Sequence, residues 1–391
     1  MKEVVILSAV RTAIGKFGGK FKEMPVTQMG AEVIKEAVSR AAVEPEEVNE
    51  CMMGIVLPAG VGQNPARQSA IKAGLPDEIG STTVNKVCGS GMKTVMFAAN
   101  SIKAEEHELI VAGGMENMSA APYLMRDARW GVRMMDSKVV DGMVYDGLWD
   151  VFNDVHMGTT GEIVAERYNI TREEADEFAY QSHMKAQRAT ENGSFAEEIL
   201  PLTIRMRKKE VEHRVDEGIR PETTLEALAK LKPFFKKDGL VTAGNSSQIS
   251  DGASALVIAS REYAESRGLE PMATIEGYAT SGTKPEWIME APIVTTRMLF
   301  EKTGMTIDDI DLFEHNEAFA SASVAVKREL GVPDDIFNVN GGAVALGHPI
   351  GCSGARVLTT LLYAMKTRKA ETGLATLCLG GGNAVSMIVR A

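Results

Sequence analysis

One order of secondary-structure elements occurs twice in this chain of 391 residues. Each copy is typical of a short strand, a glycine-rich turn, a helix that is apolar on most of its surface, and a buried strand ending in glycines. The copies cover 82–87, 90–104 and 108–114, and then 337–340, 353–366 and 373–381. Because a helix that is apolar on most sides must be buried between layers, the pattern predicts two similar α/β halves with these two helices side by side. The turn at 88–91 and the loop at 346–354 would then lie close together.

The segment between the two copies has a different texture. From about residue 119 it mixes methionine, tryptophan and charge without clean periodicity, and the α/β pattern resumes at about residue 252. A chain of this length is also too long for one small core. We therefore predict an N-terminal half at 1–118 plus 251–270, an inserted domain at 119–250 and a C-terminal half at 271–391.

The bulk composition argues against several classes of protein. The net charge of −11 disfavours nucleic-acid binding driven by overall charge. No apolar run approaches the roughly 20 residues that span a bilayer, and MKEVVILSAVR at the N-terminus is typical of a buried strand rather than a signal peptide. The four cysteines form no CxxC pair and no Cys/His cluster, which indicates neither a disulfide framework nor a zinc site and suits a reducing cytoplasm.

Cys88 lies in the turn of the first copy, in VNKVCGSGMK, where a strand ends and a helix begins. Gly89 and Gly91 permit a tight turn and close backbone approach. The partial positive charge of a helix N-terminus favours a thiolate, which predicts a depressed thiol pKa and a candidate nucleophile. A lone cysteine is more often a small buried residue, so Cys88 alone does not decide between these interpretations.

Three further segments carry groups that could work with this thiol. His348 lies in GHPIGCSG, in a loop too rich in glycine for a core, and a histidine beside a thiol can take its proton. Cys378 precedes three glycines whose N–H groups could hold an oxyanion, although alone it is typical of a buried strand cysteine. Asn316, in HNEAF, either caps the following helix or holds a water or a substrate carbonyl.

The usual signatures of several enzyme classes are absent. The sequence has no GxxxxGK[ST], GxGxxG, GxSxG or HExxH motif, which disfavours nucleotide hydrolysis, hydride transfer on a dinucleotide fold, and serine or zinc hydrolysis. The motifs VCGSG, NEAF, GHPIGCSG and CLGGG, in this order and spacing, instead resemble those of the thiolase family. The likeness covers nearly the whole chain, through SAVRTAIGKFGG at 8–19, GQNPARQ at 62–68, AGGMENMS at 112–119 and TAGNSS at 242–247.

The resemblance implies a five-layer α/β/α/β/α fold of two similar halves, with an inserted loop domain that binds coenzyme A and makes tetramer contacts. It implies an acyltransferase that condenses two acetyl-CoA molecules reversibly to acetoacetyl-CoA through an acyl-cysteine. Coenzyme A would be a substrate, and neither a bound cofactor nor a metal would be required. The expected setting is a cytoplasmic homotetramer in fatty acid metabolism, with neither nucleic acid nor membrane as a partner.

The resemblance also implies roles for individual residues. Cys88 would be the acylated nucleophile, His348 the residue that activates it, and Cys378 the acid/base that moves the α-proton. Asn316 would hold a water that polarises the thioester oxygen together with His348, and the N–H of Gly380 would complete the oxyanion hole with that of Cys88. The coenzyme A and pantetheine channel would be lined by His156, Met157, Arg220, Ser247, Ala318 and Phe319.

Two surface features fit these expectations. The apolar side chains at 123–143 have no element to bury them and predict an interface. A basic cluster in the inserted region would suit a phosphate-bearing ligand on an acidic chain. Its members are Arg205, Arg207, Lys208, Lys209 and Arg220.

The sequence departs from the family pattern at three places. WIMEAPI at 287–293 is shorter than usual and carries Glu290, which leaves the acyl chain length open and makes a thiolase for longer 3-ketoacyl-CoA chains the alternative. Gln248 stands where glycine is common, and His315 replaces a smaller residue beside Asn316.

Two other functions compete with this interpretation. Decarboxylating and hydroxymethylglutaryl-CoA-type condensing enzymes resemble this layout but lack a cysteine at the CLGGG position, so Cys378 distinguishes the chain from them. A non-catalytic acyl-CoA carrier would not need both thiols and the histidine.

Overall fold

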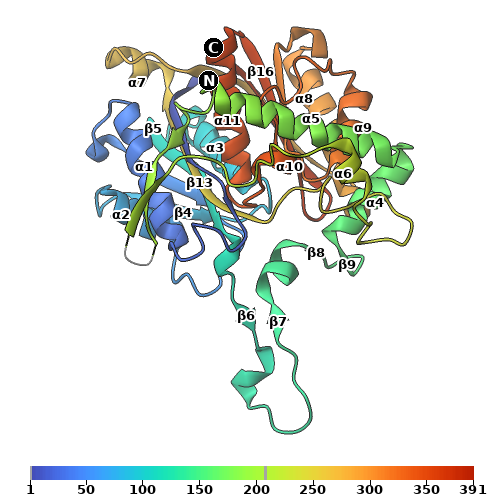
Figure 1. Ribbon diagram of the computed structural model, residues 1–391. Coiled ribbons are helices and arrows are strands. Elements are labelled where there is room, and N and C mark those ends of the chain that lie inside the picture. Colours follow the sequence, from blue (N-terminus) through green and yellow to red (C-terminus); the bar gives the residue numbers. More distant parts are fainter. Residues whose placement is uncertain (1, 207–208) are drawn as a thin grey trace.

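The computed structural model describes residues 2–206 and 209–391, and a large mixed sheet runs through it (Figure 1). The strand order is β15-β16-β17-β14-β1-β13-β5-β3-β4. The N-terminal half contributes β1 (Val4–Thr12), β3 (Glu50–Gly54), β4 (Gly80–Val84), β5 (Leu109–Asn117) and β13 (Ser250–Ser260). The C-terminal half contributes β14 (Ala273–Gly282), β15 (Leu312–His315), β16 (Thr372–Leu379) and β17 (Asn383–Arg390). The two sets join where β1 pairs with β14, at Val5–Thr274 and Ile6–Ala273.

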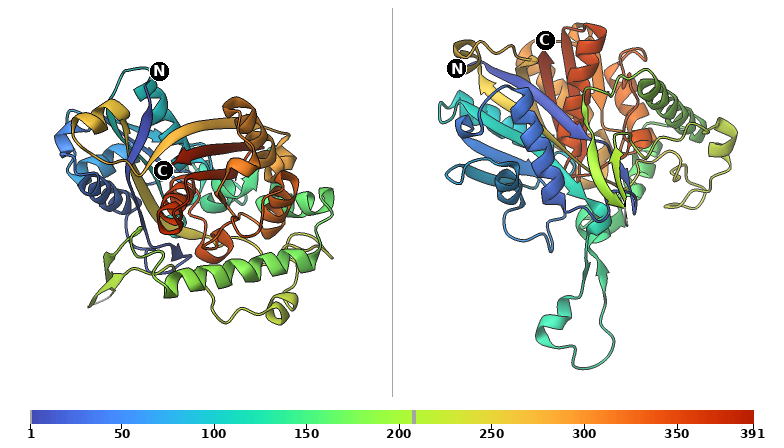
Figure 2. Two further views of the ribbon diagram at one scale, coloured as in Figure 1. Left: turned by 90° about the horizontal axis from the view of Figure 1, so that it is seen from above. Right: turned by 60° about the vertical axis from the view of Figure 1, so that its left-hand side comes forward.

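Strands β1, β5, β13, β15 and β16 are buried along their whole length, which explains their largely apolar sequences, whereas β4 and much of β14 are partly exposed. Successive residues of β1 point to opposite layers: Val5 packs with helices α1 (Val26–Arg40) and α2 (Pro65–Ala73), and Ile6 packs toward α3 (Ser90–Lys103) and α11 (Ser353–Arg368). The outer face of the C-terminal strands packs against α8 (Ala291–Thr303) and α9 (Ala320–Leu330). The layers are therefore helix, sheet, helix, sheet and helix (Figure 2), which confirms the predicted five-layer fold.

The two central helices touch at their N-terminal ends. A Cβ atom on Gly91 of α3 would lie 2.7 Å from the backbone nitrogen of Ala355, and one on Gly354 of α11 would lie 2.4 Å from that of Met92. Only glycine fits at such an approach. The predicted side-by-side arrangement of these helices is confirmed, and it brings the turns before them together.

The inserted segment adds helices along one side and a projecting arm. Its long helix α5 (Arg172–Glu191) begins with a capping box formed by Thr171 and Glu174. The other elements of the segment are η2 (Met118–Ala120), β6 (Tyr123–Leu124), η3 (Arg126–Trp130), β7 (Val140–Asp141), η4 (Met143–Gly147), β8 (Trp149–Asp150), β9 (Val155–His156), α4 (Met157–Arg167), β10 (Ile199–Leu200), β11 (Leu202–Met206), β12 (Lys209–His213) and α6 (Leu225–Ala229). The arm that carries β6 and β7 extends away from the body in Figures 1 and 2.

Short elements complete the chain, namely β2 (Gly15–Lys16), η1 (Pro45–Glu47), α7 (Arg261–Ser266), η5 (Pro285–Glu290), η6 (Ile307–Asp309) and α10 (Ala343–Leu346). Among helices within residues 2–206 and 209–391, none combines the length and apolar character that a membrane crossing requires. The exact domain boundaries given above stay a prediction.

Four predicted strands differ from the structure, and one of them, expected at 373–381, ends at Leu379. The strand expected at 82–87 ends at Val84, and that expected to end at Gly114 continues to Asn117. Gly113 and Gly114 lie within β5 and do not end it. Glycine is needed there because a Cβ would lie 2.2 Å from the carbonyl oxygen of Ser254 at position 113 and 2.2 Å from that of Gly351 at position 114. Residues 337–340, which are among the described residues, form no strand, since Phe337 makes a single bridge to Phe313.

Candidate active site

Cys88 lies in a turn that is fixed by hydrogen bonds on both sides. Val87 has a φ of 47°, a left-handed conformation that costs a β-branched residue about 1–3 kcal/mol. The Ser90 hydroxyl accepts from the N–H of Lys86 (2.8 Å) and donates to the carbonyl of Val87 (2.6 Å), and Asn85 Oδ1 accepts from the N–H of Val87 (3.0 Å). These bonds hold a strained backbone, and so they fix where the next residue, Cys88, places its sulfur.

Two backbone N–H groups converge on the Cys88 thiol, its own and that of Gly380. Gly380 follows β16 and packs so closely that a Cβ there would lie 3.0 Å from Cγ1 of Val87. On the other side of the turn, a Cβ on Gly89 would lie 2.4 Å from Cδ2 of Leu379. The end of β16 thus packs against the Cys88 turn and brings two backbone N–H groups to one place, which are the donors that an oxyanion hole requires.

Burial, and not the helix N-terminus, dominates the titration of Cys88. The side chain packs against the apolar cluster that contains Val56, Leu57 and Ile350. This burial raises the pKa of the Cys88 thiol to about 12, although the two N–H groups lower it. The prediction of a depressed pKa for Cys88 is therefore wrong, because the sequence shows the helix start and not the apolar surroundings.

His348 lies in the loop before α11, where its backbone N–H donates to the carbonyl of Gln248 (3.0 Å). Burial, followed by the nearby Arg356 guanidinium, lowers the pKa of His348 to about 3, so the ring is neutral at physiological pH. The ring nitrogen Nδ1 lies 2.6 Å from Ser353 Oγ, and Ser353 Oγ donates to the carbonyl of Pro349 (2.9 Å). Since a hydroxyl has one proton to give, Ser353 must accept from Nδ1–H, which leaves the Nε2 lone pair free to take a proton.

Asn316 completes the environment of that lone pair. Its Nδ2 atom lies 3.4 Å from His348 Nε2, and its backbone N–H donates to the carbonyl of Thr376 (3.1 Å). The N-cap of α9 is Phe319 and has no side-chain hydrogen bond, so Asn316 does not cap this helix. Within the part of the chain that the structure describes, Asn316 Oδ1 is buried without a hydrogen-bond partner, which favours the interpretation that it holds a water or a substrate group.

Glu317 holds the Asn316 loop from behind. Its buried carboxylate accepts from the Ser182 hydroxyl (2.6 Å), from Asn338 Nδ2 (2.8 Å) and from the N–H of Val344 (3.1 Å). These bonds connect α5 and α10 to the loop between β15 and α9. Glu317 is not among the catalytic residues predicted from the sequence. Its three hydrogen bonds support the loop that carries Asn316.

Cys378 lies near the end of β16, close to the first thiol. Burial, and then the proximity of Cys88, raise the pKa of the Cys378 thiol well above its ordinary value. Its sulfur lies 3.7 Å from the Met289 Sδ atom, and its side chain packs in one cluster with Ala318 and Phe319. Sequence analysis missed Met289, which is 89 positions from the cysteine that it contacts.

Most residues predicted for the coenzyme A channel lie around this cluster. Met157 packs against the cluster that contains Ala318 and Phe319. The N–H of Ser247 donates to the carbonyl of Ala318 (3.0 Å). The ring of His156 stacks on Phe235 with 4.7 Å between centroids, a contact the sequence did not indicate.

Arg220 and the predicted basic cluster are arranged differently from expectation. The N–H of Arg220 donates to Nδ1 of His183 (3.3 Å), which places Arg220 beside α5. Lys209 lies instead at the start of β12, in the β11–β12 hairpin. Arg205 is paired in the same hairpin, and Arg207 and Lys208 lie outside the described residues. Arg220 therefore lies apart from Lys209, so these two members of the predicted basic cluster are not neighbours.

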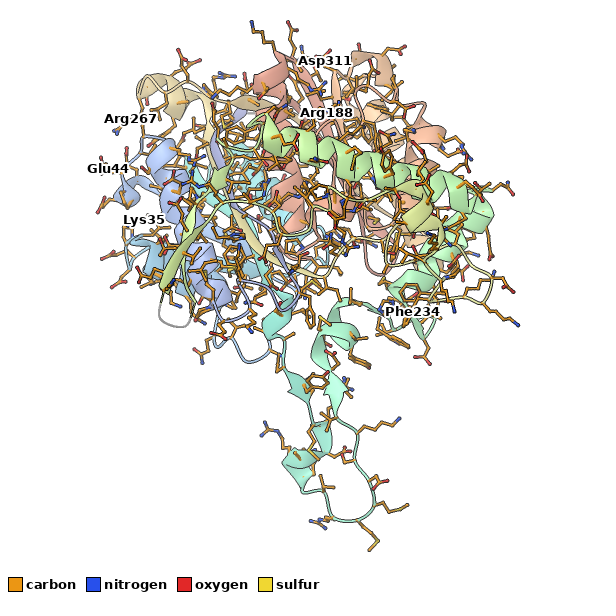
Figure 3. The ribbon with its side chains drawn as sticks, in the orientation of Figure 1. Lys35, Glu44, Arg188, Phe234, Arg267 and Asp311 are labelled. Atoms are coloured by element: carbon orange, nitrogen blue, oxygen red, sulfur yellow. The ribbon has the colours of Figure 1, made fainter. Side chains whose placement is uncertain are left out.

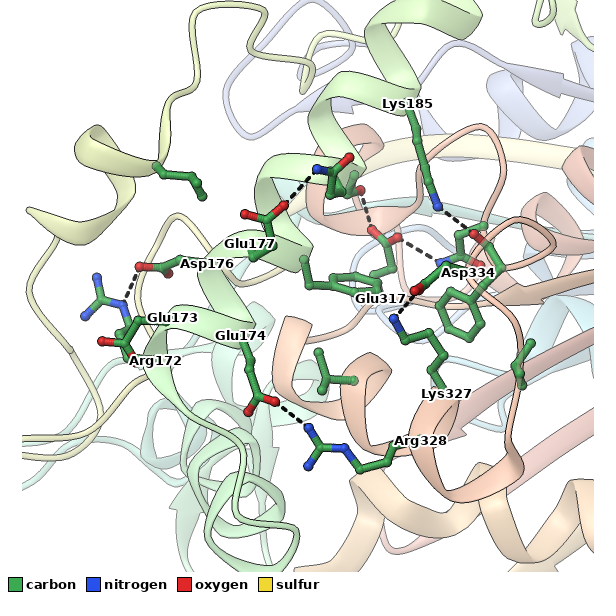
Figure 4. Close-up of a pocket in the computed structure, with 18 of the residues that line it drawn as sticks. Arg172, Glu173, Glu174, Asp176, Glu177, Lys185, Glu317, Lys327, Arg328 and Asp334 are labelled. Carbon is green, nitrogen blue, oxygen red and sulfur yellow. Dashed lines mark hydrogen bonds and ion pairs between the residues drawn. The ribbon is translucent and has the colours of Figure 1, made fainter.

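A large cavity lies elsewhere, between α5 and α9 (Figure 4). It measures about 1120 Å³, and its lining includes Glu317 but neither of the two thiols nor His348. Its charged side chains are paired across it, as in Arg328–Glu174 (2.5 Å), or along one helix, as in Arg172–Asp176 (2.7 Å). The pair Arg328–Glu174 connects the inserted segment with the C-terminal half.

The three departures from the family pattern also have defined places. Gln248 Nε2 donates to the carbonyl of Gly218 (2.7 Å) and so attaches the loop before Arg220 to the segment that precedes β13 and pairs with His348. His315 is buried, and its Nδ1 lies 2.9 Å from Ser323 Oγ. Glu290 pairs with Arg167.

The chain is similar to known proteins over its whole length. The family description "Thiolase, N-terminal domain" matches residues 4–262, and "Thiolase, C-terminal domain" matches 269–391. Acetyl-CoA acetyltransferases of Cupriavidus necator and Pseudomonas aeruginosa are 52% and 51% identical over 391 and 388 residues, covering 99% or more of both chains. A probable acetyl-CoA acyltransferase of Staphylococcus epidermidis is 47% identical over 390 residues, with 100% of this chain and 99% of the relative covered. The crystal structure of the Bacillus anthracis acetyl-CoA acetyltransferase superposes with a TM-score of 0.98 at 43% identity, covering 100% of this chain and 99% of that one.

Proposed function

Because this chain belongs to the thiolase family, we propose that it is an acetyl-CoA C-acetyltransferase. It would condense two acetyl-CoA molecules to acetoacetyl-CoA and coenzyme A, and catalyse the reverse thiolysis. The observation that carries the proposal is the pair of neighbouring thiols, Cys88 and Cys378, with two backbone N–H groups on the Cys88 thiol. His348 is neutral, and its loop packs near Cys88 through Ile350. The names of full-length relatives at about half identity support the choice of substrate.

In the first half-reaction Cys88 attacks the thioester carbon of acetyl-CoA. Its proton passes to His348 Nε2, and the carbonyl oxygen, now an oxyanion, accepts from the N–H groups of Cys88 and Gly380. The carbon–sulfur bond to coenzyme A then breaks, and the departing sulfur takes the proton of Cys378. The products are acetyl-Cys88 and free coenzyme A, and the site holds a Cys378 thiolate with a His348 imidazolium, so its charge is balanced.

In the second half-reaction the Cys378 thiolate removes an α-proton from another acetyl-CoA. A thiol of raised pKa suits this step, because the C–H bond is weakly acidic and needs a strong base. The enolate oxygen is stabilised by His348 Nε2–H and by the Asn316 side chain or a water that it holds. The enolate carbon forms a bond to the acetyl carbon, and the Cys88 sulfur leaves and regains its proton from His348.

Coenzyme A would enter along the inserted region. The channel of this proposal is lined by His156, Met157, Ser247, Ala318 and Phe319, with Arg220 near a phosphate. No resident cofactor is required, because coenzyme A is a substrate of thiolases. The two catalytic cysteines must stay reduced, and all four cysteines are free thiols, which supports a reducing cytoplasm as the setting.

The projecting arm supports a homotetramer. Four of its large side chains are strongly exposed, namely Tyr123 (68%), Trp130 (79%), Met134 (88%) and Met135 (88%). Exposed apolar groups of this kind on a monomer mark an interface. The symmetric assembly would bury them against the arm of another copy.

The direct test is an assay of the purified protein with acetoacetyl-CoA and free coenzyme A. Formation of two acetyl-CoA molecules per acetoacetyl-CoA, with an added acetyl mass on the Cys88 peptide, would support the proposal. The second candidate, a thiolase for longer chains, rests on the altered segment around Glu290. A steady-state series over 3-ketoacyl-CoA chain length separates the two.

A further inference from the structure

The short helix η5 presents one side chain directly to the candidate acid/base. Met289, near the end of η5, is buried, and its Sδ atom lies 3.7 Å from Cys378 Sγ. Ala318 and Phe319 belong to the same buried cluster. Met289 therefore forms one wall of the space around the second thiol, the space in which the end of a short acyl group would have to fit.

The residue that follows Met289 is attached to a different helix by an ion pair. The Glu290 carboxylate accepts from Arg167 Nε (2.9 Å) and Nη2 (3.2 Å), so the pair is bidentate. The Glu290 side chain is nearly buried. The adjacent Tyr168 hydroxyl has its pKa raised to about 12, first by its own burial and then by the Glu290 carboxylate. The guanidinium of Arg167 also stacks 3.9 Å from the ring centroid of Trp287. Arg167 thus holds η5 at two points, one on each side of Met289.

We propose that the ion pair between Glu290 and Arg167 positions Met289 against Cys378 and so restricts the acyl pocket to short chains. This inference rests on the proposed function and assigns its chain-length selectivity to a residue pair outside the catalytic groups. Glu290 and Arg167 are positioning residues, because the structure shows neither in contact with a catalytic side chain.

Met289 can act as a wall of the pocket only if η5 is anchored. Methionine is flexible and adapts to the space that its neighbours leave, so its backbone must be fixed if it is to act as a wall. Trp287 in the middle of η5 has non-helical angles (φ −100°, ψ 21°), and so the helix does not fix itself. A nearly buried carboxylate that loses its cation also carries a large penalty, which favours movement of this segment when the pair is broken. A longer acyl chain could then occupy the space that Met289 leaves.

The test compares kcat/KM for thiolysis of 3-oxohexanoyl-CoA with that of acetoacetyl-CoA, each with free coenzyme A. Met289→Ala should raise the ratio of longer to shorter substrate by about tenfold or more, since a hydrophobic pocket discriminates one methylene by about 10- to 200-fold. Glu290→Gln and Arg167→Met should each raise it at least about threefold. The double variant should exceed neither single variant by more than about twofold, because both changes break one contact.

The matched control is Glu47→Gln. Glu47 makes a similar bidentate pair with Arg267, at 2.9 Å and 3.0 Å, between η1 and α7. Figures 1 and 2 show α7 on the opposite side of the molecule from α8. Glu47→Gln should lower the free energy of unfolding about as much as Glu290→Gln does. It should leave the ratio of kcat/KM for the two substrates within about twofold of wild type, because this ion pair is far from the pocket.

Three outcomes would overturn the inference. The first is that Met289→Ala shifts the ratio of kcat/KM for the longer to the shorter substrate, while Glu290→Gln and Arg167→Met both leave it unchanged. The second is that Met289→Ala itself leaves this ratio unchanged. The third is an equal shift in Glu47→Gln, which would indicate a general effect of stability. If Arg167→Met does not fold, Arg167→Lys keeps the charge without the bidentate contact and should shift the ratio in the same direction. A wild-type protein without thiolysis activity on either substrate would instead overturn the proposed function.

Discussion

Ser353 Oγ lies 2.6 Å from Nδ1 of His348 and, by donating its own proton to the carbonyl of Pro349, fixes which ring nitrogen carries the proton. The two residues are only five positions apart, with His348 in the loop before α11 and Ser353 at the first position of that helix, so one glycine-rich segment carries both the base and the group that orients it. In a buried site the wrong tautomer would leave a proton where a lone pair is needed.

Ser353→Ala should therefore lower kcat for thiolysis by about 10- to 100-fold, the usual effect of a small misplacement of a catalytic group. The control is Ser323→Ala, which removes an equivalent partner 2.9 Å from Nδ1 of the buried, non-catalytic His315. Its kcat should stay within about threefold of wild type, as for a site outside the chemistry. Equal losses in the two variants would indicate a general folding effect.

Alkylation by iodoacetamide should label Cys88 first, because Cys51, Cys352 and Cys378 are all buried. Since burial raises the pKa of Cys88 to about 12, the thiolate fraction and the labelling rate should rise about tenfold per pH unit between roughly pH 7 and 10. A rate that reaches a plateau near neutral pH would show a depressed pKa instead. Peptide mapping with Cys51 or Cys352 labelled first would contradict the order.

Arg220→Ala should raise KM for coenzyme A about fivefold, the upper end for an exposed ion pair, with a smaller effect on kcat. Lys209→Ala, at the start of β12, is the control and should change neither constant. An unchanged KM in Arg220→Ala would remove this residue from the binding channel.

Light scattering at micromolar concentration should report four chains per particle. Replacing Trp130, Met134 and Met135 with serine should shift the particle toward two chains, because the exposed apolar area of the arm is lost. Phe234→Ser is the control, since Phe234 is equally exposed but lies on the body of the molecule (Figure 3). A stable wild-type monomer would contradict the assembly.

The layered fold could be predicted from the sequence because local patterns encode it. Apolar helices such as 90–104 and strands buried on both faces leave few alternatives, and glycine-rich turns mark where Cys88, His348 and Cys378 lie. The strand expected at 337–340 failed because four apolar and polar residues carry too weak a period to distinguish a strand from an extended loop.

The relationships that tune the site could not be predicted, because they join distant parts of the chain. Met289 meets Cys378 across 89 positions, and Arg167 meets Glu290 across 123. The pKa of Cys88 depends on apolar neighbours that gather only in the folded protein. The contact between Ser353 and His348 is the exception, because the two residues are only five positions apart and this spacing could have indicated it.

The central claim is that the two thiols divide the chemistry, and Cys378→Ser tests it most directly. Serine keeps roughly the volume but has a much higher pKa, so removal of the α-proton should fail. Acylation should continue, because the coenzyme A sulfur can depart as a thiolate without the proton that Cys378 gives it in the wild type. The variant should therefore form acetyl-Cys88, seen as a mass increase on that peptide, while condensation falls about 100-fold or more. Cys51→Ser, another buried cysteine, should keep both steps. Near-normal condensation by Cys378→Ser would contradict the account.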